Sequence, residues 1–263
     1  MRTIKVRGVL ILLLCLALHQ GVSATQDPGQ DQSDLDTYLH STNPHLREHA
    51  YELKGAKWPG QHVFVCWENP SPDFQNGMHL VQEEVQETWV AHSQLMVTGW
   101  EKCAAKNKGI HILIDDSGPH TQYLGRQLDG LKNGMVLNFT FLSWGPQCQQ
   151  TLDYCIKGIA GHEFGHAIGF AHENDRPDKP PNRPGECLPT KDQKGDTMLT
   201  PYDEHSIMNY CNSKYNNDGK LSALDIDAVQ KLYGAPRPTQ GKLSSPERNW
   251  ARLDTVLNEP NGL

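Results

Sequence analysis

The sequence has no stripe of basic residues and, beyond its first residues, no long apolar run. Its 24 lysines and arginines are outnumbered by 31 aspartates and glutamates, which gives a formal net charge of −7. Without a basic patch, nucleic acids and anionic membranes are not expected as partners. A membrane-spanning helix needs about 20 consecutive apolar residues, and no segment reaches that length. We therefore expect neither a nucleic-acid partner nor a membrane partner.

The first apolar run is too short for a membrane anchor and has the layout of a secretory signal. Three basic residues precede a ten-residue apolar core, Val9 to Leu18, and Val22-Ser23-Ala24 provides a small-residue cleavage site. Residues 1–24 are therefore predicted to be a signal peptide, and the mature protein is predicted to be secreted and extracellular.

The motif CxxC does not occur in the sequence, and its absence disfavours a zinc-cysteine cluster. Cys15 leaves with the predicted signal, and an even number of cysteines in an exported chain indicates disulfides. Six cysteines allow 15 pairings. We expect Cys148 to pair with Cys155 and Cys187 with Cys211, because each pair brackets one local segment. The six cysteines are Cys66, Cys103, Cys148, Cys155, Cys187 and Cys211.

The rest of the chain contains no internal repeat and divides by composition into three parts. Residues 25–56 are polar and short of aliphatic side chains, which predicts a leader or propeptide rather than core. Residues 57–234 have the apolar content of one folded domain. Residues 235–263 offer no core and are interpreted as a C-terminal tail.

Within the central part, apolar spacing predicts alternating strands and helices. The capping box Ser222 to Asp225 marks the start of the last helix, and Gly234 marks its end. The segment between Arg176 and Thr200 is rich in proline, lysine and aspartate and is predicted to be a surface loop. Strands are expected at His62–Trp67, 95–100, 110–114 and Met135–Leu142, and helices at 77–92 and 152–169.

The most specific pattern is HExxHxxGxxH, which begins at His162. On a helix, His162 and His166 lie one turn apart on the same face, so both imidazoles reach one metal ion. Gly169 permits the positive φ that brings His172 back as a third ligand. Three nitrogens leave an open coordination position, which favours a catalytic zinc ion over a structural one, and Glu163 lies beside it. The plainer interpretation, a helix with histidines on a polar face, does not explain the complete pattern.

A second motif, Ser206-Ile207-Met208-Asn209-Tyr210, follows downstream. Together the two motifs resemble the metzincin clan of zinc endopeptidases, in which a methionine-bearing turn underlies the metal. The finer resemblance is to the astacin family, because Glu173, Arg176 and Asp178 continue its HExxRxD pattern. The turn differs from the astacin YDxxSIMHY pattern only at Asn209, where astacins have histidine.

This resemblance implies an α+β fold, a twisted mixed β-sheet with an active-site helix and a small C-terminal subdomain that ends in a helix. It implies one zinc ion per chain and Glu163 as general base and acid. Tyr210 matches an additional zinc ligand that also stabilises the oxyanion, although simple packing is its alternative role. Met208 is expected to pack beneath the site. Glu173 matches a glutamate near the mature N-terminus, with a surface carboxylate as the alternative.

The predicted activity is therefore that of a secreted zinc endopeptidase, expected to be a monomer, with a protein or peptide as substrate. An extended substrate is expected to pair with the strand Met135–Leu142. Astacins are made as zymogens, but this leader has neither an FxGD motif nor a cysteine to block zinc. Two alternatives remain: a serralysin-like protease, disfavoured by Glu173, and a non-catalytic binding or toxin component on the same scaffold. Asn138, in the sequon Asn-Phe-Thr, is a glycosylation candidate.

Overall fold

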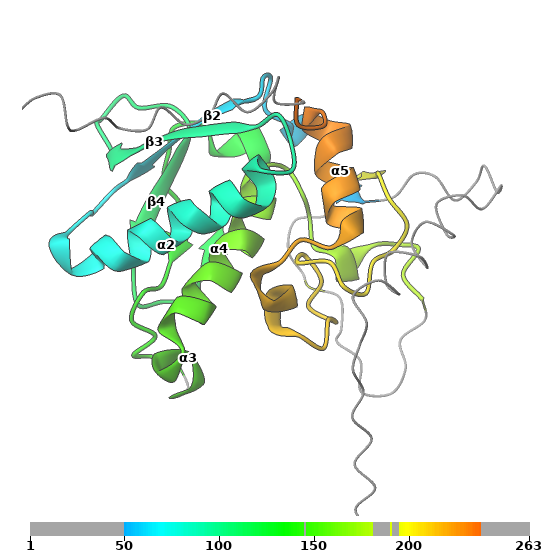
Figure 1. The fold of residues 1–263 in the computed structure, drawn as a ribbon. Helices are drawn as coiled ribbons and strands as arrows, with labels where there is room; N and C mark the ends of the chain where they lie inside the picture. Colours follow the sequence, from blue (N-terminus) through cyan, green and yellow to red (C-terminus); the bar gives the residue numbers. More distant parts are fainter. Residues whose placement is uncertain (1–49, 145, 181–189, 191–194, 238–263) are drawn as a thin grey trace, which may run out of the picture. The chain divides into compact units, whose positions relative to one another are not determined.

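The computed structural model describes residues 50–144, 146–180, 190 and 195–237, and these contain a five-stranded sheet (Figure 1). Its strand order is β3-β2-β4-β6-β5. Neighbouring strands are parallel except β5, which runs antiparallel to β6 at one edge. The strands are β2 (His62–Trp67), β3 (Met96–Lys102), β4 (Ile110–Ile114), β5 (His120–Thr121) and β6 (Leu131–Leu137).

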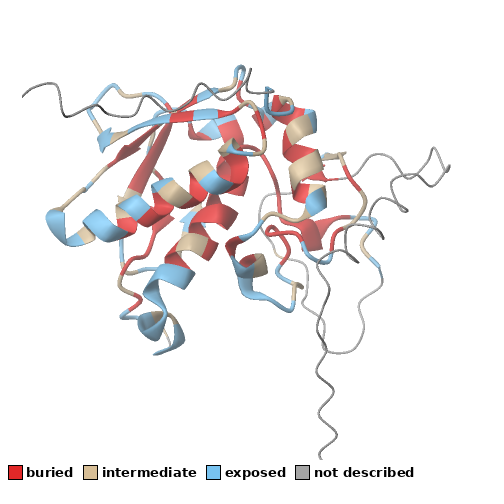
Figure 2. Cartoon of the chain, viewed as in Figure 1, coloured by how far each residue is buried: buried red, intermediate tan, exposed pale blue. Residues whose placement is uncertain are grey.

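Two helices, α2 (Gln75–Val85) and α4 (Leu152–Ala167), lie side by side against this sheet (Figure 1). Their inward faces bury the core, shown in red in Figure 2. The indole of Trp89 is fully buried and donates a hydrogen bond of 2.8 Å to the carbonyl of Gly161, which ties the end of the first helix to the second. The other helical segments before α4 are η2 (Lys54–Ala56), η3 (Pro72–Phe74), η4 (Gln86–Val90), η5 (Gly125–Leu128) and α3 (Pro146–Gln150).

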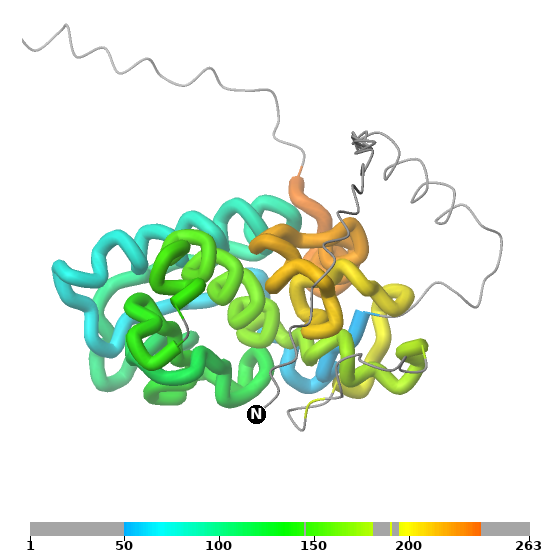
Figure 3. Tube along the Cα trace, turned by 90° about the horizontal axis from the view of Figure 1, so that it is seen from below, coloured from blue at the N-terminus to red at the C-terminus, as the bar shows by residue number. Residues whose placement is uncertain are grey.

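The C-terminal part of the fold packs beside α4. It comprises η6 (Glu173–Asp175), β7 (Thr197–Met198), η7 (Tyr215–Gly219) and α5 (Ala223–Tyr233). In Figure 3 the orange segment that carries η7 lies along the green helix α4. The predicted capping box is present, since Ser222 accepts from the Asp225 N–H, and the helix ends at Gly234 with φ of 88°. The fold-class prediction is confirmed: the chain has a mixed sheet, an active-site helix and a final helix. In the described residues no helix is both long and apolar enough to span a membrane.

Residues 50–56, expected to belong to the polar leader, are built into the fold. Strand β1 (Tyr51–Glu52) pairs antiparallel with β7, and Ala56 is completely buried. The Leu53 N–H donates to the carbonyl of Gly169 at 3.2 Å. Backbone pairing with distant residues therefore holds a segment whose own composition shows no core signal. The boundary at 56 between leader and domain stays a prediction.

The strand expected at Met135–Leu142 is β6, which begins earlier, at Leu131, and ends earlier, at Leu137. Phe141 has a φ of 52°, which is incompatible with a strand, and the residues around it form a loop. This strand is also not at the edge of the sheet, because β5 covers it. The expectation that this strand is an exposed edge with which the substrate pairs is therefore wrong, and the edge on this side of the sheet belongs to β5.

Helix α2 carries an unusual buried carboxyl group. Glu84 is 5% exposed, and its Oε1 has no hydrogen-bond partner among the described residues. Only glycines leave room for it: a Cβ at Gly161 or Gly219 would lie 3.1 or 3.3 Å from Oε1. Burial raises the pKa of Glu84 to about 7.

Glu84 is expected to make the protein less stable as pH rises. The folded state holds this proton more tightly than the unfolded state, where the pKa is near 4.5. The stabilisation is complete below pH 4.5 and is lost as pH rises through 7, by an amount on the order of 1–3 kcal/mol. Urea unfolding between about pH 5 and 8 should show Glu84→Gln gaining stability over the wild type with increasing pH.

The control is Glu83→Gln on the same helix turn, where Lys157 lowers the pKa of Glu83 below the range tested. If Glu84→Gln and the wild type showed the same pH dependence, the buried carboxyl would not be the cause.

Candidate metal centre

Three imidazoles meet at one point near the end of α4. The Nε2 atom of His172 lies 3.2 Å from Nε2 of His162 and 3.0 Å from Nε2 of His166. The first two histidines come from one face of the helix. The third is returned by the turn at Gly169, whose φ is 114° as the sequence predicted. The described residues thus bring all three expected ligands together.

The other ring nitrogen of each histidine has an oxygen partner. Nδ1 of His162 donates to the carbonyl of Ile207, and Nδ1 of His166 donates to the carbonyl of Phe170, both at 2.7 Å. Because a carbonyl only accepts, these bonds place the proton on Nδ1 and leave the lone pair on Nε2. The tautomer that a metal ion requires is therefore fixed by the protein.

Electrostatics also favours neutral, metal-binding rings. Burial, helped by the neighbouring His166, lowers the pKa of His162 to about 3. Burial and the two other histidines likewise hold the pKa of His172 far below its usual range. The rings of His162 and His172 are therefore unprotonated at neutral pH and available as ligands.

These nitrogens fit zinc. A tetrahedral zinc ion with Zn–N distances of about 2.0–2.1 Å keeps its ligand nitrogens roughly 3.3 Å apart, close to the separations found here. Three neutral imidazoles with oriented Nδ1 protons are a donor set typical of catalytic zinc. The residues present thus suit the metal that the sequence predicted.

Glu163 lies beside the three histidines. Its side chain is 5% exposed, and its Oε2 accepts a hydrogen bond of 2.7 Å from the hydroxyl of Thr121 on β5. The carboxylate is thus held between the active-site helix and the edge of the sheet. The sequence predicted a role for Glu163 but gave no sign of Thr121, because nothing local links residues 42 positions apart.

The turn after Ser206 closes the site from two sides. The ring of Tyr210 stacks on His162 with 5.1 Å between centroids and lies 4.4 Å from the ring of His172. Met208 packs below, so closely that a Cβ on Gly165 would overlap its sulfur. Met208 therefore packs against the helix at Gly165, where a larger side chain would force this methionine to shift.

Glu173 is buried, not a surface carboxylate, and it is paired within the chain. Its Oε1 accepts from Nη1 of Arg176 at 3.0 Å and from the Asp203 N–H at 2.9 Å. Burial raises the pKa of Glu173 to about 8, and Arg176 opposes the rise. Arg176 itself is 3% exposed and also binds Asp178, so the predicted surface loop begins with a buried arginine. Much of that loop, residues 181–189 and 191–194, lies outside the described residues.

Two further residues orient His172. Its Nδ1 lies 3.1 Å from the hydroxyl of Thr190, which in turn donates to the carboxylate of Asp175. Asp175 is 9% exposed and also accepts from the Thr190 N–H. Neither residue is singled out by the sequence, because a threonine in a proline-rich segment carries no signal of its own.

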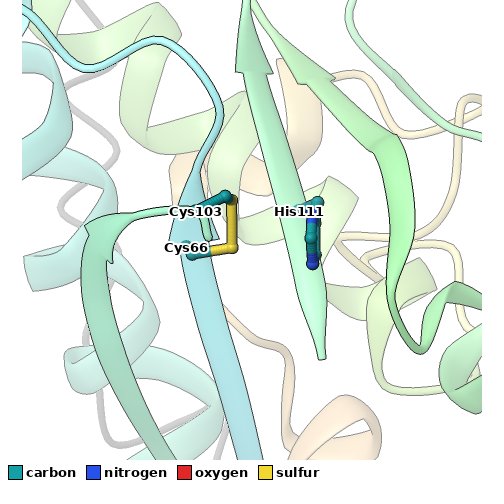
Figure 4. Close-up of side chains that lie close together, drawn as sticks. All are labelled: Cys66, Cys103 and His111. Atoms are coloured by element: carbon teal, nitrogen blue, oxygen red, sulfur yellow. A yellow bond between two sulfur atoms is a disulfide. The ribbon is translucent and has the colours of Figure 1, made fainter. Parts of the chain in front are cut away.

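A second cluster of potential ligands, Cys66, Cys103 and His111, lies on the sheet (Figure 4). The two sulfurs form a disulfide, and both ring nitrogens of His111 lie within hydrogen-bond distance of oxygens, Glu68 Oε1 at 2.8 Å and the Asn107 carbonyl at 3.1 Å. These atoms are therefore already engaged, and only the histidine triad qualifies as a metal centre in the part of the chain described.

The disulfide predictions are resolved in part. Cys148 pairs with Cys155, as predicted. Cys211 is disulfide-bonded, but Cys187 lies outside the described residues, so the predicted pair of these two stays a prediction. The pair of Cys66 with Cys103 was not anticipated, because β2 and β3 bring together cysteines 37 positions apart.

Asn138 is poorly placed for a glycan. The residue is 1% exposed, and its amide nitrogen donates to Asp116 Oδ1 at 3.0 Å and to the Ser117 carbonyl at 3.2 Å. A glycan on this nitrogen would break both bonds and require space that the fold fills. The structure therefore favours the alternative that this residue serves the fold.

Comparisons with known proteins agree with the site. Residues 136–182 match the model of the peptidase family Astacin. Bone morphogenetic protein 1 of Xenopus laevis is 30% identical over 39% of this chain and 20% of its own length. Zinc metalloproteinase nas-36 of Haemonchus contortus is 32% identical over 32% of the chain and 19% of its own length. The chain thus matches only about a fifth of the length of these relatives.

Among solved structures, myroilysin superposes with a TM-score of 0.51 over 71% of this chain and 98% of its own, at 21% sequence identity. That likeness supports the fold alone. The matched family segment includes His162, Glu163, His166 and His172. The comparisons therefore confirm the resemblance to the astacin family of zinc metalloendopeptidases, the enzyme class predicted from the sequence, in the segment that carries the metal centre.

Proposed function

We propose that the chain is a secreted zinc-dependent endopeptidase. The observation that carries this proposal is the convergence of three Nε2 atoms, with Nε2 of His172 within 3.2 Å of the other two and the buried carboxylate of Glu163 beside them. A binding scaffold has no physical need for a general base, and an oriented carboxylate next to an open metal position is what peptide hydrolysis requires.

His162, His166 and His172 would hold the zinc ion. When bound, zinc supplies Lewis-acid chemistry: it polarises the scissile carbonyl and makes water acidic enough to attack near neutral pH. Glu163 takes the proton from the attacking water and then delivers it to the leaving amine nitrogen. The hydrogen bond from Thr121 fixes the orientation of the carboxylate for this transfer.

Tyr210 completes the site in this proposal. Its ring rests on His162 and His172, and the side chain is 48% exposed, so the phenol has room to move. In the resting state its hydroxyl would be a metal ligand. During the reaction the hydroxyl would turn away and donate a hydrogen bond to the developing oxyanion. Met208 holds the helix from below through its contact with Gly165.

The substrate is proposed to be an extended protein or peptide segment that pairs with the free edge of β5. Main-chain pairing of this kind accepts many sequences, since it does not depend on side chains. The substrate is thus proposed to pair with β5 instead of the strand Met135–Leu142 that the sequence predicted.

Glu173 is proposed to mark the place of the processed N-terminus. A small cavity is lined by Ala50, Glu173 and Asp225, among others. Cleavage near residue 50, before the boundary at 56 expected from composition, would place an amino group close to these carboxyl groups. The boundaries proposed are therefore a signal at 1–24, a leader from residue 25 to about residue 50, a catalytic domain from there to residue 234, and a tail at 235–263.

The test is the hydrolysis of denatured casein by the purified secreted protein, before and after removal of metal with 1,10-phenanthroline. Cleavage should disappear with the chelator and return with added zinc, because the proposed chemistry needs the metal. Limited trypsin treatment of the full-length form tests latency in the same assay.

Two results would contradict the proposal. Activity that survives complete zinc removal would exclude this metal centre as its source. No cleavage by either the full-length or the trimmed form, with zinc bound, would favour the non-catalytic binding component.

A further inference from the structure

We propose that Thr121 is a positioning residue that couples the docking of substrate on β5 to the orientation of the Glu163 carboxylate. This inference rests on the proposed peptidase function. It assigns a role to a side chain that lies outside both zinc motifs and that no feature of the sequence singles out.

The side chain of Thr121 faces the active-site helix. Its hydroxyl lies 2.7 Å from Oε2 of Glu163 and 3.2 Å from the main-chain carbonyl of the same residue. A threonine hydroxyl has one proton, and the shorter contact to a carboxylate is the stronger hydrogen bond. Thr121 therefore fixes one carboxylate oxygen of Glu163 and, with it, the direction in which the whole carboxylate faces.

The main-chain N–H and C=O of Thr121 point away from β6, toward the free edge of the sheet. Thr121 is opposite Met135 on β6, and the next residue, Gln122, donates its N–H to the carbonyl of Gly134 at 2.8 Å. In an antiparallel pair, successive residues direct their N–H and C=O groups alternately toward and away from the partner strand. The N–H and C=O of Thr121 therefore point away from β6, where an added strand would bind them.

One residue thus contacts the substrate through its backbone and the general base through its side chain. Threonine suits both tasks, because β-branching favours the strand and restricts the χ1 angle that aims the hydroxyl. When a peptide pairs with β5, the scissile bond and the carboxylate are placed relative to the same residue. A displacement of about 1 Å between such groups costs up to about 100-fold in rate.

The experiment compares Thr121→Val and Thr121→Ser with the wild type on a fluorogenic peptide, with zinc content measured for each protein. Valine keeps the shape and β propensity but has no hydroxyl. Thr121→Val should lower kcat by about 10- to 100-fold, leave KM within about threefold because backbone pairing is preserved, and retain full zinc. Thr121→Ser should restore most of kcat.

Thr98→Val is the matched control. Thr98 lies on β3 at the opposite edge, where its hydroxyl bonds His62. This variant should keep the wild-type kcat.

Equal kcat values for wild type and Thr121→Val would overturn the positioning role. So would a loss that serine does not restore, or one expressed only in KM, because either result would indicate a purely structural strand residue. An inactive wild-type protein would instead contradict the proposed peptidase function. The two failures are therefore distinguishable.

Discussion

Replacing Glu163 with alanine is expected to lower kcat/KM for peptide hydrolysis by about 10³-fold or more, while the protein keeps its zinc. The three histidines proposed to hold the metal have their Nδ1 atoms within hydrogen-bond distance of Ile207, Phe170 and Thr190. In the proposed mechanism the carboxylate transfers a proton, and such transfer accounts for roughly 10²- to 10⁴-fold in enzymes that use a general acid or base. Peptide cleavage kinetics and atomic absorption on the same preparation measure the two quantities.

Glu101→Ala serves as the control, since Glu101 is exposed on β3, at the edge of the sheet opposite β5. It should behave as the wild type. A Glu163→Ala protein that retained most of its activity would remove Glu163 from the mechanism. One that lost zinc as well would show that this residue supports the metal site rather than the chemistry alone.

Replacing Arg176 with methionine should give the largest loss of stability of any single change considered, about 3–5 kcal/mol. The guanidinium is buried and binds Asp178 through two nitrogens, at 2.9 and 2.7 Å. It also donates to Glu173 and to the carbonyl of Thr200. Methionine fills much of the same space but removes every guanidinium donor, so among the described residues the buried Glu173 keeps only the Asp203 N–H and the Thr200 carbonyl loses this bond. A buried polar group that loses its partner pays a desolvation cost. Urea unfolding at neutral pH measures the loss.

Arg126→Met provides the comparison. Arg126 is exposed and donates to the carbonyl of Gly55, so its replacement should cost less than about 1 kcal/mol. Arg176→Lys should be intermediate, because an ammonium group does not reproduce the two parallel bonds to Asp178. Equal losses for Arg176→Met and Arg126→Met would mean that the buried ion pairs contribute nothing net.

The parts of the fold that follow from the sequence are those with local signals. Helix α5 begins at a capping box and ends at a glycine with positive φ, and both features depend on a few neighbouring residues. The zinc ligands follow for the same reason, since His162 and His166 are one helical turn apart and Gly169 reverses the chain for His172.

The parts of the fold that the sequence does not predict depend on contacts between distant residues. Strand β5 consists of only two residues, His120 and Thr121, and no alternation of apolar residues marks it. This strand forms because β6 provides backbone groups with which it pairs. Residues 50–56 look like leader by composition, yet Ala50, Tyr51, Glu52 and Ala56 are buried, because the segment pairs with β7 and with the turn after α4. Arg176 has the same character, because its burial depends on acceptors contributed from several segments.

The bonds that orient the histidines differ in how they respond to mutation. The acceptors for His162 and His166 are carbonyls of Ile207 and Phe170, and every amino acid has a carbonyl. Substitution at Ile207 or Phe170 leaves the acceptor atom in place. Mutations there therefore preserve the hydrogen bonds that orient His162 and His166. His172 depends on a hydroxyl and a carboxylate, which single substitutions remove. Inherited or engineered variation in metal affinity should therefore arise mainly at Thr190 and Asp175.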